Sequence, residues 1–189
     1  MTEGVQHAAG VQIHIRDARA SDAATIATIY NEGIRGRGAT FEKKERSPED
    51  VAGWLASVAR IKRPFLVADR VDGNGGDAEV VGWVRASEYR SRPCYDGVAE
   101  FSVYVSSRAR GQRVGDALMA RFVEACAEAG VWKILSRIFP ENSASRGLCA
   151  RHGFREVGVY ERHAQLDGVW RDVVIVERLI AANLEHWRG

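Results

Sequence analysis

The fold is decided by the stretch Ala99-Glu-Phe-Ser-Val-Tyr-Val-Ser-Ser-Arg-Ala-Arg-Gly-Gln-Arg-Val-Gly-Asp-Ala-Leu118. Its residues 99–105 are mostly β-branched or aromatic, a composition typical of a strand. From Val114 onward, apolar residues recur at the spacing of one helix face as far as Gly130. The sequence therefore predicts a strand that passes through a short turn into a helix.

The turn between them, Arg108-Ala-Arg-Gly-Gln-Arg-Val-Gly115, is basic and carries two glycines. Where a strand enters a helix through such a turn, several backbone N–H groups have no partner within the helix, and the helix dipole adds partial positive charge. This arrangement suits a phosphate or pyrophosphate, and the arginines add charge and forked donors. The alternative is an ordinary strand-to-helix connection whose arginines are solvated.

Two motifs carry a resemblance to the GNAT acetyltransferase superfamily. The segment Arg110-Gly-Gln-Arg113-Val-Gly115 resembles its acyl-CoA pyrophosphate loop, Arg/Gln-x-x-Gly-x-Gly/Ala, with Arg113 at the middle glycine. If that position needs a positive φ, arginine costs about 1 kcal/mol there. The second motif, Asn142-Ser-Ala-Ser-Arg-Gly-Leu-Cys-Ala-Arg-His-Gly-Phe154, resembles the superfamily signature Asn-x-x-Ala/Ser-x-x-Leu-x-x-x-x-Gly-Phe.

Within that superfamily, the chain resembles the phosphinothricin and methionine sulfoximine acetyltransferases and, most closely, their arsinothricin-acetylating relatives. The matching segments are residues 29–33, 39–42, 98–105, 139–142 and 166–173. The resemblance implies a GNAT fold of the α/β (α+β) class: a mixed, mainly antiparallel twisted sheet of about seven strands with helices on both faces. In that fold the strand ending at Val105 and the strand from Val131 splay apart, and the pantetheine arm of acetyl-CoA enters the gap.

The rest of the chain supplies the other elements of such a sheet. Alternating or continuous apolar runs predict strands at 11–16, 65–69, 79–86, 131–138, 155–165 and 169–179. Helices are expected after caps at Ser21-Asp22, Ser47 and Asn142 or Ser143, and a short one at 181–187. Turns are expected at 72–76 and at Asp167-Gly168.

Length and composition bound the class of protein. A chain of 189 residues predicts one domain, residues 11–189, behind a flexible N-terminus at 1–10. The mixed charge, net +2, does not point to nucleic acid as the main partner. Three cysteines without paired spacing argue against a disulfide framework or a metal site. No apolar run approaches the roughly 20 residues of a membrane span, so we expect a cytoplasmic protein that does not bind membranes.

Acetyl transfer to an amine needs a base, a donor for the developing oxyanion and a proton for the leaving thiolate. Glu100 is the candidate base; the alternative is a strand-end carboxylate paired with an arginine. The backbone N–H of Val103 or Tyr104 is the candidate oxyanion donor, because a splayed strand leaves amides without a ladder partner. Cys149 is a candidate acid, although free cysteines usually pack as small apolar groups. Water can supply the proton as well, and Tyr104 and Tyr160 are weaker alternatives.

The resemblance also assigns the co-substrate contacts. The pyrophosphate is expected on Gly111, Gln112, Arg113, Val114 and Gly115 with Arg110 beside it, the pantetheine arm on Val103 and Val105, and the thioester end near Asn142 and Ser145. Asn142 is equally a simple helix cap, and both roles can coexist.

The acceptor contacts are expected on two loops. The loop at 35–47 carries Phe41 and Glu42, and the loop after residue 86 carries Arg90 and Arg92. In the family that the chain resembles, the loop after residue 86 lies at the acceptor pocket, which implies that one of these arginines pairs with a substrate carboxylate or phosphinate by two forked bonds; the alternative is a solvated hairpin loop. Trp170, beside the last turn, resembles a segment that meets a second subunit and implies a homodimer, or else it covers its own core.

The sequence thus predicts an acetyl-CoA-dependent N-acetyltransferase for a small glutamate-like amino acid, namely arsinothricin, phosphinothricin or methionine sulfoximine, that confers resistance. Two alternatives stay open. A polyamine or protein acetyltransferase is disfavoured because the predicted acceptor loop is basic. A regulatory module that binds acyl-CoA without turnover is disfavoured by Glu100.

Overall fold

The computed structural model describes residues 5–7, 11–71 and 78–185. Its strands are β1 Val5–His7, β2 Val11–Asp17, β3 Phe65–Val71, β4 Glu79–Glu88, β5 Val98–Val105, β6 Lys133–Ile138, β7 Arg155–Leu166 and β8 Val169–Leu179. Its helices are α1 Ala23–Arg35, α2 Pro48–Arg60, α3 Val114–Glu128, α4 Ser143–Arg151 and α5 Ala181–Leu184, with 3-10 turns η1 Ala20–Asp22, η2 Pro93–Tyr95 and η3 Ser107–Ala109.

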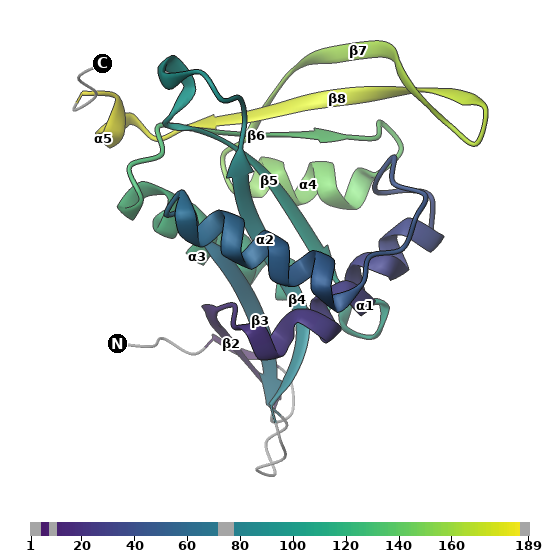
Figure 1. Cartoon of the computed structure of the whole chain (residues 1–189), viewed down its shortest axis with the longest axis vertical. Coiled ribbons are helices and arrows are strands. Elements are labelled where there is room, and N and C mark those ends of the chain that lie inside the picture. The colour runs from purple at the N-terminus through teal and green to yellow at the C-terminus, as the bar shows by residue number, and fades with distance from the viewer. Residues whose placement is uncertain (1–4, 8–10, 72–77, 186–189) are drawn as a thin grey trace.

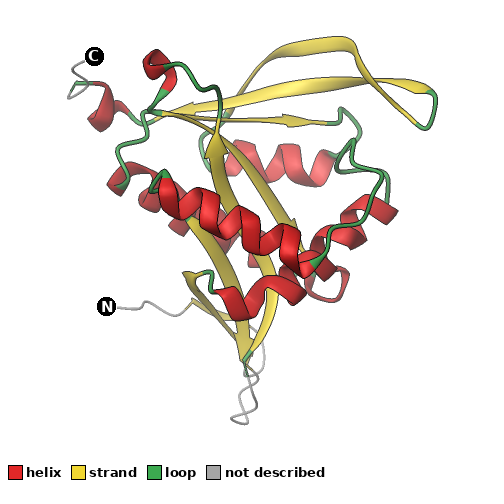
Figure 2. Cartoon of the chain, viewed as in Figure 1, coloured by secondary structure: helices red, strands yellow, loops and turns green. Residues whose placement is uncertain are grey.

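The strands form one sheet in the order β1-β2-β3-β4-β5-β6-β8-β7, antiparallel except for the β5–β6 pair. α1 and α2 cover one face, where they bury an aromatic and aliphatic cluster around Trp83, and α3 packs on the other around Phe122 (Figure 1). Figure 2 shows the helices on either side of the sheet. The predicted mixed, mainly antiparallel sheet with helices on both faces is confirmed, and β1 adds one short strand at its edge.

Local sequence explains most element boundaries. Ser47 caps α2 as predicted: its side chain accepts a hydrogen bond from the Asp50 N–H, and Pro48 occupies the first turn. Asp167 and Gly168 both have positive φ, as the two-residue turn between β7 and β8 requires. The predicted strand from Val131 begins two residues later, because the Val131 N–H closes α3 by donating to the Cys126 carbonyl.

Three predictions touch residues outside the description. Of the flexible N-terminus predicted at 1–10, the structure describes 5–7, which pair with β2 as β1. The turn predicted at 72–76 lies outside the described residues. The terminal helix predicted at 181–187 ends at Leu184, and its last two predicted residues are not described. No helix in the described ranges is long and apolar enough to cross a membrane.

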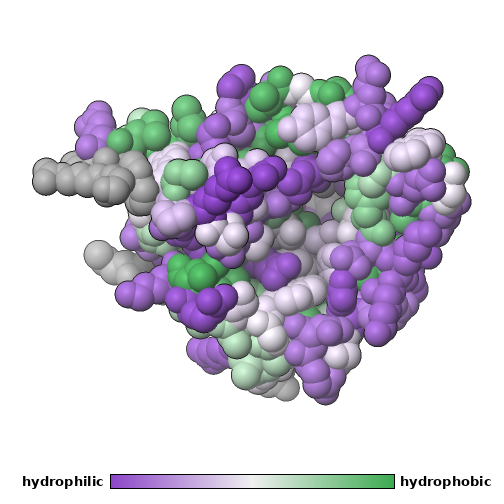
Figure 3. All heavy atoms as spheres, turned by 45° about the horizontal axis from the view of Figure 1, so that its top comes forward, coloured by the Kyte–Doolittle hydropathy of each residue, from purple (hydrophilic) through white to green (hydrophobic). Residues whose placement is uncertain are grey.

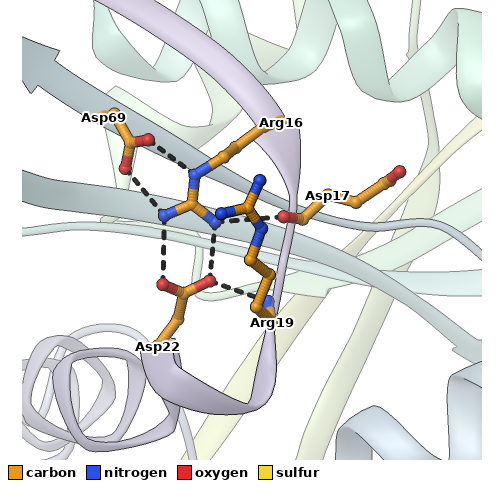
Figure 4. Close-up of polar contacts among 5 residues, drawn as sticks. All are labelled: Arg16, Asp17, Arg19, Asp22 and Asp69. Atoms are coloured by element: carbon orange, nitrogen blue, oxygen red, sulfur yellow. Dashed lines mark hydrogen bonds and ion pairs between the residues drawn. The ribbon is translucent and has the colours of Figure 1, made fainter. Parts of the chain in front are cut away.

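Asp22 is the N-cap residue of α1, in agreement with the cap predicted at Ser21-Asp22, but its side chain makes no capping hydrogen bond and belongs to an ion-pair network. Arg16 donates to both carboxylates that flank it, 2.7 Å to Asp22 and 2.6 Å to Asp69 (Figure 4). The Arg19 N–H also donates to Asp22, so that carboxylate is not a cap of α1. Burial alone would raise the pKa of Asp22, but the bonds from Arg16 and Arg19 outweigh burial and hold the pKa below its usual value. The network fixes the start of α1 against β2 and β3.

The feature that positions the site is a split between β5 and β6. These strands pair in parallel only from Val98 to Glu100, and from Phe101 onward β5 pairs with β4 alone. The Ser136 hydroxyl on β6 bridges the start of the split by donating to the Phe101 carbonyl at 2.9 Å. The predicted divergence of the two strands is therefore present, beginning directly after Glu100.

Candidate active site

Two cavities meet at the split. One, of about 500 Å³, opens on the α1 and α2 face and is lined by Glu100, Arg137 and the loop at 39–42. The other, of about 700 Å³, runs to the start of α3 and is lined by the glycine-bearing turn. The two share Ala39, Val103, Tyr104, Asn142 and Ser145 in their walls. The face that carries β7, β8 and α2 is hollowed near its middle, with hydrophilic side chains along the rim (Figure 3).

The turn before α3 has the backbone of an anion site. Gly111 has a φ of +76°, and Arg113, the N-cap of α3, has a φ of +60°. The position where Arg113 replaces a glycine thus does need the left-handed conformation, at a cost of about 1 kcal/mol for a residue with a Cβ. No Arg113 side-chain hydrogen bond caps the helix, which leaves its first N–H groups directed toward the cavity.

The residues of this turn fit a pyrophosphate and a thin pantetheine arm. The cavity of about 700 Å³ forms a groove beside the start of α3. A Cβ at Gly115 would lie 3.2 Å from Leu148 Cδ2, so glycine keeps this groove open. Arg110 and Arg113 line this groove. Gln112 does not line it; its side chain donates to the Arg108 carbonyl at 2.9 Å and stabilises the turn instead.

Glu32 is a residue of the groove that sequence reasoning missed. Its carboxylate accepts from the Ser107 N–H at 2.7 Å and from the Ser106 hydroxyl at 3.3 Å. These bonds attach α1 to the beginning of the turn. The sequence signal was an acid inside a predicted amphipathic helix, which is usually a solvated position.

Backbone direction distinguishes the two candidate oxyanion donors. The Phe101 carbonyl faces β6, where it accepts from the Ser136 hydroxyl, whereas the Ser106 N–H donates to the Val81 carbonyl of β4. Because backbone groups alternate in direction along a strand, the N–H groups of Val103 and Val105 point into the split and that of Tyr104 points to β4. The geometry therefore favours Val103 over Tyr104 as donor and keeps Val105 as a contact for the pantetheine arm.

Glu100 lies at the mouth of the split with an arginine beside it. Arg137, on β6, donates to the Glu100 carboxylate. Both side chains line the cavity of about 500 Å³, which we call the acceptor cavity. The Glu100 side chain is one-quarter exposed. Both interpretations offered by the sequence therefore meet here: the carboxylate is an arginine partner, and it also faces the cavity in the position of a base.

Asn142 and Ser145 join the two cavities. The Asn142 side chain accepts from the Ser145 N–H at 3.1 Å, which makes it the N-cap of α4, and its amide donates to the Gly38 carbonyl at 3.2 Å. The cap predicted at Asn142 is confirmed. Its second bond fixes the loop after α1 against α4, so this one side chain closes the wall at the junction.

Of the candidate acids, Cys149 is buried and Tyr104 is half-buried. Burial raises the pKa of the Cys149 thiol to about 12, and the residue packs in the core under α4 with one edge on the cavity. Burial likewise raises the pKa of Tyr104 well above its usual value, and its hydroxyl donates to the Ala39 carbonyl at 3.2 Å. Both groups remain protonated at neutral pH. The surroundings of Cys149 favour the packing role.

The acceptor side differs from the sequence prediction in its arginines. Phe41 and Glu42 line the cavity as expected, with Phe41 edge-on to Phe139 at 4.9 Å between ring centroids. Arg90 and Arg92 are exposed and line neither cavity. Within this chain, the loop after residue 86 therefore does not bring them to the site.

One other arginine lines this cavity, and a second lies across the sheet register from a cavity residue. Arg137 lines the cavity, and Arg85 lies opposite Ser102, a cavity residue, in the β4–β5 register. Arg85 stacks over Trp54 at 4.2 Å, and burial lowers its pKa below the usual value. In the described part of the chain no carboxylate forms an ion pair with Arg85, and its Nε is buried without a hydrogen-bond partner. The signal in the sequence was a charged residue inside an otherwise apolar strand.

A groove that fits acyl-CoA and opens through a split sheet onto an acceptor cavity defines an acyltransferase. The Acetyltransferase (GNAT) family model matches residues 37–154, and the chain belongs to this family. It is an N-acetyltransferase that uses acetyl-CoA.

Particular relatives narrow the branch. The chain is 32% identical over 171 residues to the phosphinothricin N-acetyltransferase of Alcaligenes faecalis, covering 89% of this chain and 83% of the relative. It is 31% identical over 166 residues to the L-methionine sulfoximine/L-methionine sulfone acetyltransferase of Pseudomonas paraeruginosa, covering 86% and 92%. The structure of the Sinorhizobium meliloti phosphinothricin acetyltransferase in complex with acetyl-CoA matches with a TM-score of 0.80 at 29% identity, covering 89% and 88%.

Proposed function

We propose that this acetyltransferase acetylates the α-amino group of a small glutamate-like amino acid, with phosphinothricin, methionine sulfoximine and arsinothricin as the candidate acceptors, and so confers resistance to them. These acceptors combine an α-amino acid head with a tetrahedral polar or anionic tail. Support comes from relatives named for phosphinothricin and methionine sulfoximine. The observation that carries the proposal is the pairing of Glu100 with Arg137 in the wall of the cavity at the split.

The proposed reaction uses the residues at the split in turn. An α-ammonium group is the main form near neutral pH, so a base is needed, and Glu100 accepts its proton directly or through a water. The amine nitrogen then bonds to the thioester carbon, and the Val103 N–H stabilises the oxyanion that forms. As the C–S bond breaks, the nitrogen loses its second proton to water, and the departing thiolate gains a proton from water or from a cavity side chain, which gives the amide and free coenzyme A. Asn142 holds the loop and helix that enclose this junction.

The proposal is tested by measuring free coenzyme A released from acetyl-CoA by purified protein. The acceptor panel is phosphinothricin, methionine sulfoximine, arsinothricin, glutamate, spermidine and a lysine peptide. We expect turnover confined to the glutamate-like acceptors. Turnover of spermidine or the peptide instead would favour the alternative acetyltransferase functions, and tight binding of acetyl-CoA without any turnover would favour a regulatory module.

We further propose that the protein is a homodimer that pairs through the hairpin of β7 and β8. Val157, Val159, Tyr160, Val169 and Trp170 on this hairpin are each about half exposed, and β7 is an edge strand of the sheet. Exposed apolar side chains gathered on one edge are typical of an association surface. Light scattering after gel filtration tests this: wild type should give the mass of a dimer, and Trp170→Glu should lower it. A monomeric wild type would contradict the proposal.

A further inference from the structure

Arg137 is a cavity residue whose one bond in the described chain is to the candidate base. It lies on β6 opposite Ile175 of β8, on the sheet face toward α1 and α2, and its side chain is about one-third exposed. Its guanidinium donates to a single Glu100 oxygen and leaves other N–H donors directed to the cavity. A forked donor set of this kind matches a carboxylate.

A second ion pair on β6 lies away from the cavities and so contrasts with the Arg137–Glu100 pair. Lys133, on the same face of the same strand, pairs with Glu177 at 2.7 Å, and Arg155 also donates to that carboxylate. That cluster lies outside both cavities. The Arg137–Glu100 pair is the one on this strand that a bound acceptor would meet.

The position of Glu100 limits which part of an acceptor can reach Arg137. If Glu100 takes a proton from the α-amino group, the amine nitrogen lies within hydrogen-bond distance of its carboxylate. In an amino acid the α-carboxylate is attached to the same carbon as that nitrogen. Because Arg137 contacts Glu100 directly, the α-carboxylate is the acceptor group that falls next to Arg137.

We propose that Arg137 is the α-carboxylate-binding residue of this enzyme, and that the acceptor's carboxylate takes over the guanidinium that Glu100 holds in its absence. Glu100 is then released to accept the ammonium proton. This inference rests on the proposed function and adds to it the reason for selecting amino acids: amines, polyamines and peptide N-termini lack the carboxylate that frees the base. The tail of the acceptor is left to other groups of the cavity.

The test compares two acceptors that differ only in that carboxylate: L-methionine sulfone and 3-(methylsulfonyl)propylamine. Both have an uncharged tail, so the ratio of their kcat/KM values reports the α-carboxylate alone. We expect wild type to prefer the amino acid by about 10- to 100-fold, as charge-assisted hydrogen bonds of ordinary strength would give. Arg137→Ala should bring the ratio close to one, mainly through KM, and Arg137→Lys should restore part of it.

Arg155→Ala is the matched control, because it removes an arginine–carboxylate bond beside β6 but outside the cavities. It should leave the ratio unchanged. A purely structural role for Arg137 would lower the rates with both acceptors equally, and an unchanged ratio in Arg137→Ala would overturn the proposal.

Binding measured by calorimetry separates this inference from the proposed function. Wild type that binds methionine sulfone more tightly than the amine, with the difference lost in Arg137→Ala, supports the role of Arg137 even without turnover. Turnover of glutamate-like acceptors with no such difference leaves the proposed function standing and overturns the role of Arg137. Failure of wild type to bind methionine sulfone overturns the role as well.

Discussion

The co-substrate groove and the acceptor cavity are built from different parts of the chain. The groove is made of backbone: a turn with two left-handed residues, a helix start and the N–H groups of Val103 and Val105. The cavity is lined mainly by residues of β5, β6 and the loop at 39–42, with Glu42, Glu100 and Arg137 as charged residues in its wall. The comparison teaches that backbone geometry fixes what donates the acetyl group, whereas a few side chains select what receives it.

The largest effect on kcat should come from removing the charge of Glu100, the candidate base. Glu100→Gln should lower kcat by about 10²-fold or more while leaving the KM for acetyl-CoA nearly unchanged, as loss of a general base does. Initial rates with each substrate varied measure this. Glu45→Gln, which removes an exposed carboxylate paired with Arg35, is the control and should be silent. If Glu100 acted only as the partner of Arg137, the rates of Glu100→Gln and Arg137→Ala would match, and the base would have to be sought elsewhere.

Asn142 lines both the co-substrate groove and the acceptor cavity, and its replacement should lower both stability and activity. Asn142→Ala should lower the free energy of unfolding by about 1 kcal/mol through loss of the α4 cap. It should also lower kcat/KM, because the bond to Gly38 that closes the junction is lost. Chemical denaturation and steady-state kinetics measure the two quantities.

Ser47→Ala removes the matching cap of α2, far from the junction. Ser47→Ala should lower the free energy of unfolding by a similar amount and leave kcat/KM unchanged. Equal activity loss in both variants would mean that Asn142 acts through stability alone.

A smaller effect is expected from Arg113, the groove residue with a positive φ. Arg113→Gly should raise the free energy of unfolding by about 0.5–1 kcal/mol, since glycine removes the strain of a positive φ at a partial cost in unfolded-state entropy. The KM for acetyl-CoA should rise only about twofold, because an exposed cation adds little to a site made of backbone N–H groups.

Arg162→Gly tests the same strain outside the groove, where φ is +46°. It should add stability without changing either KM. A tenfold rise in the KM for acetyl-CoA in Arg113→Gly would show that side-chain charge, and not backbone, binds the pyrophosphate.

The smallest effect concerns the carboxylate beside the helix start. The hydrogen bond from Arg151 holds the pKa of Asp116 below its usual value. Its stabilising contribution is therefore present above the unfolded pKa of about 3.9 and is lost as pH falls through the lower folded pKa. Asp116→Asn should cost less than about 1 kcal/mol at pH 7, and the difference from wild type should shrink below pH 4. A difference that grows on acidification would contradict this sign.

The co-substrate groove and the acceptor cavity also differ in how far the sequence alone predicts them. The groove was predictable because a glycine-bearing turn between strand and helix determines backbone geometry locally, and Arg113 marked the strained position. The divergence after Glu100 followed from the resemblance. The arginine of the cavity was not predictable in the same way: Arg137 lies on β6, 37 residues after Glu100, and only the pairing of β5 with β6 brings the two side chains together. Arg90 and Arg92 are exposed and line neither cavity of the described chain.

The division between the halves is tested most directly by measuring both KM values in one variant from each half. Gly115→Val narrows the groove beside Leu148 and should raise the KM for acetyl-CoA about tenfold, with the KM for methionine sulfone unchanged. Arg137→Ala should do the reverse. If both variants raise the same KM, the groove and the cavity are not separate binding sites, and this account of the enzyme is wrong.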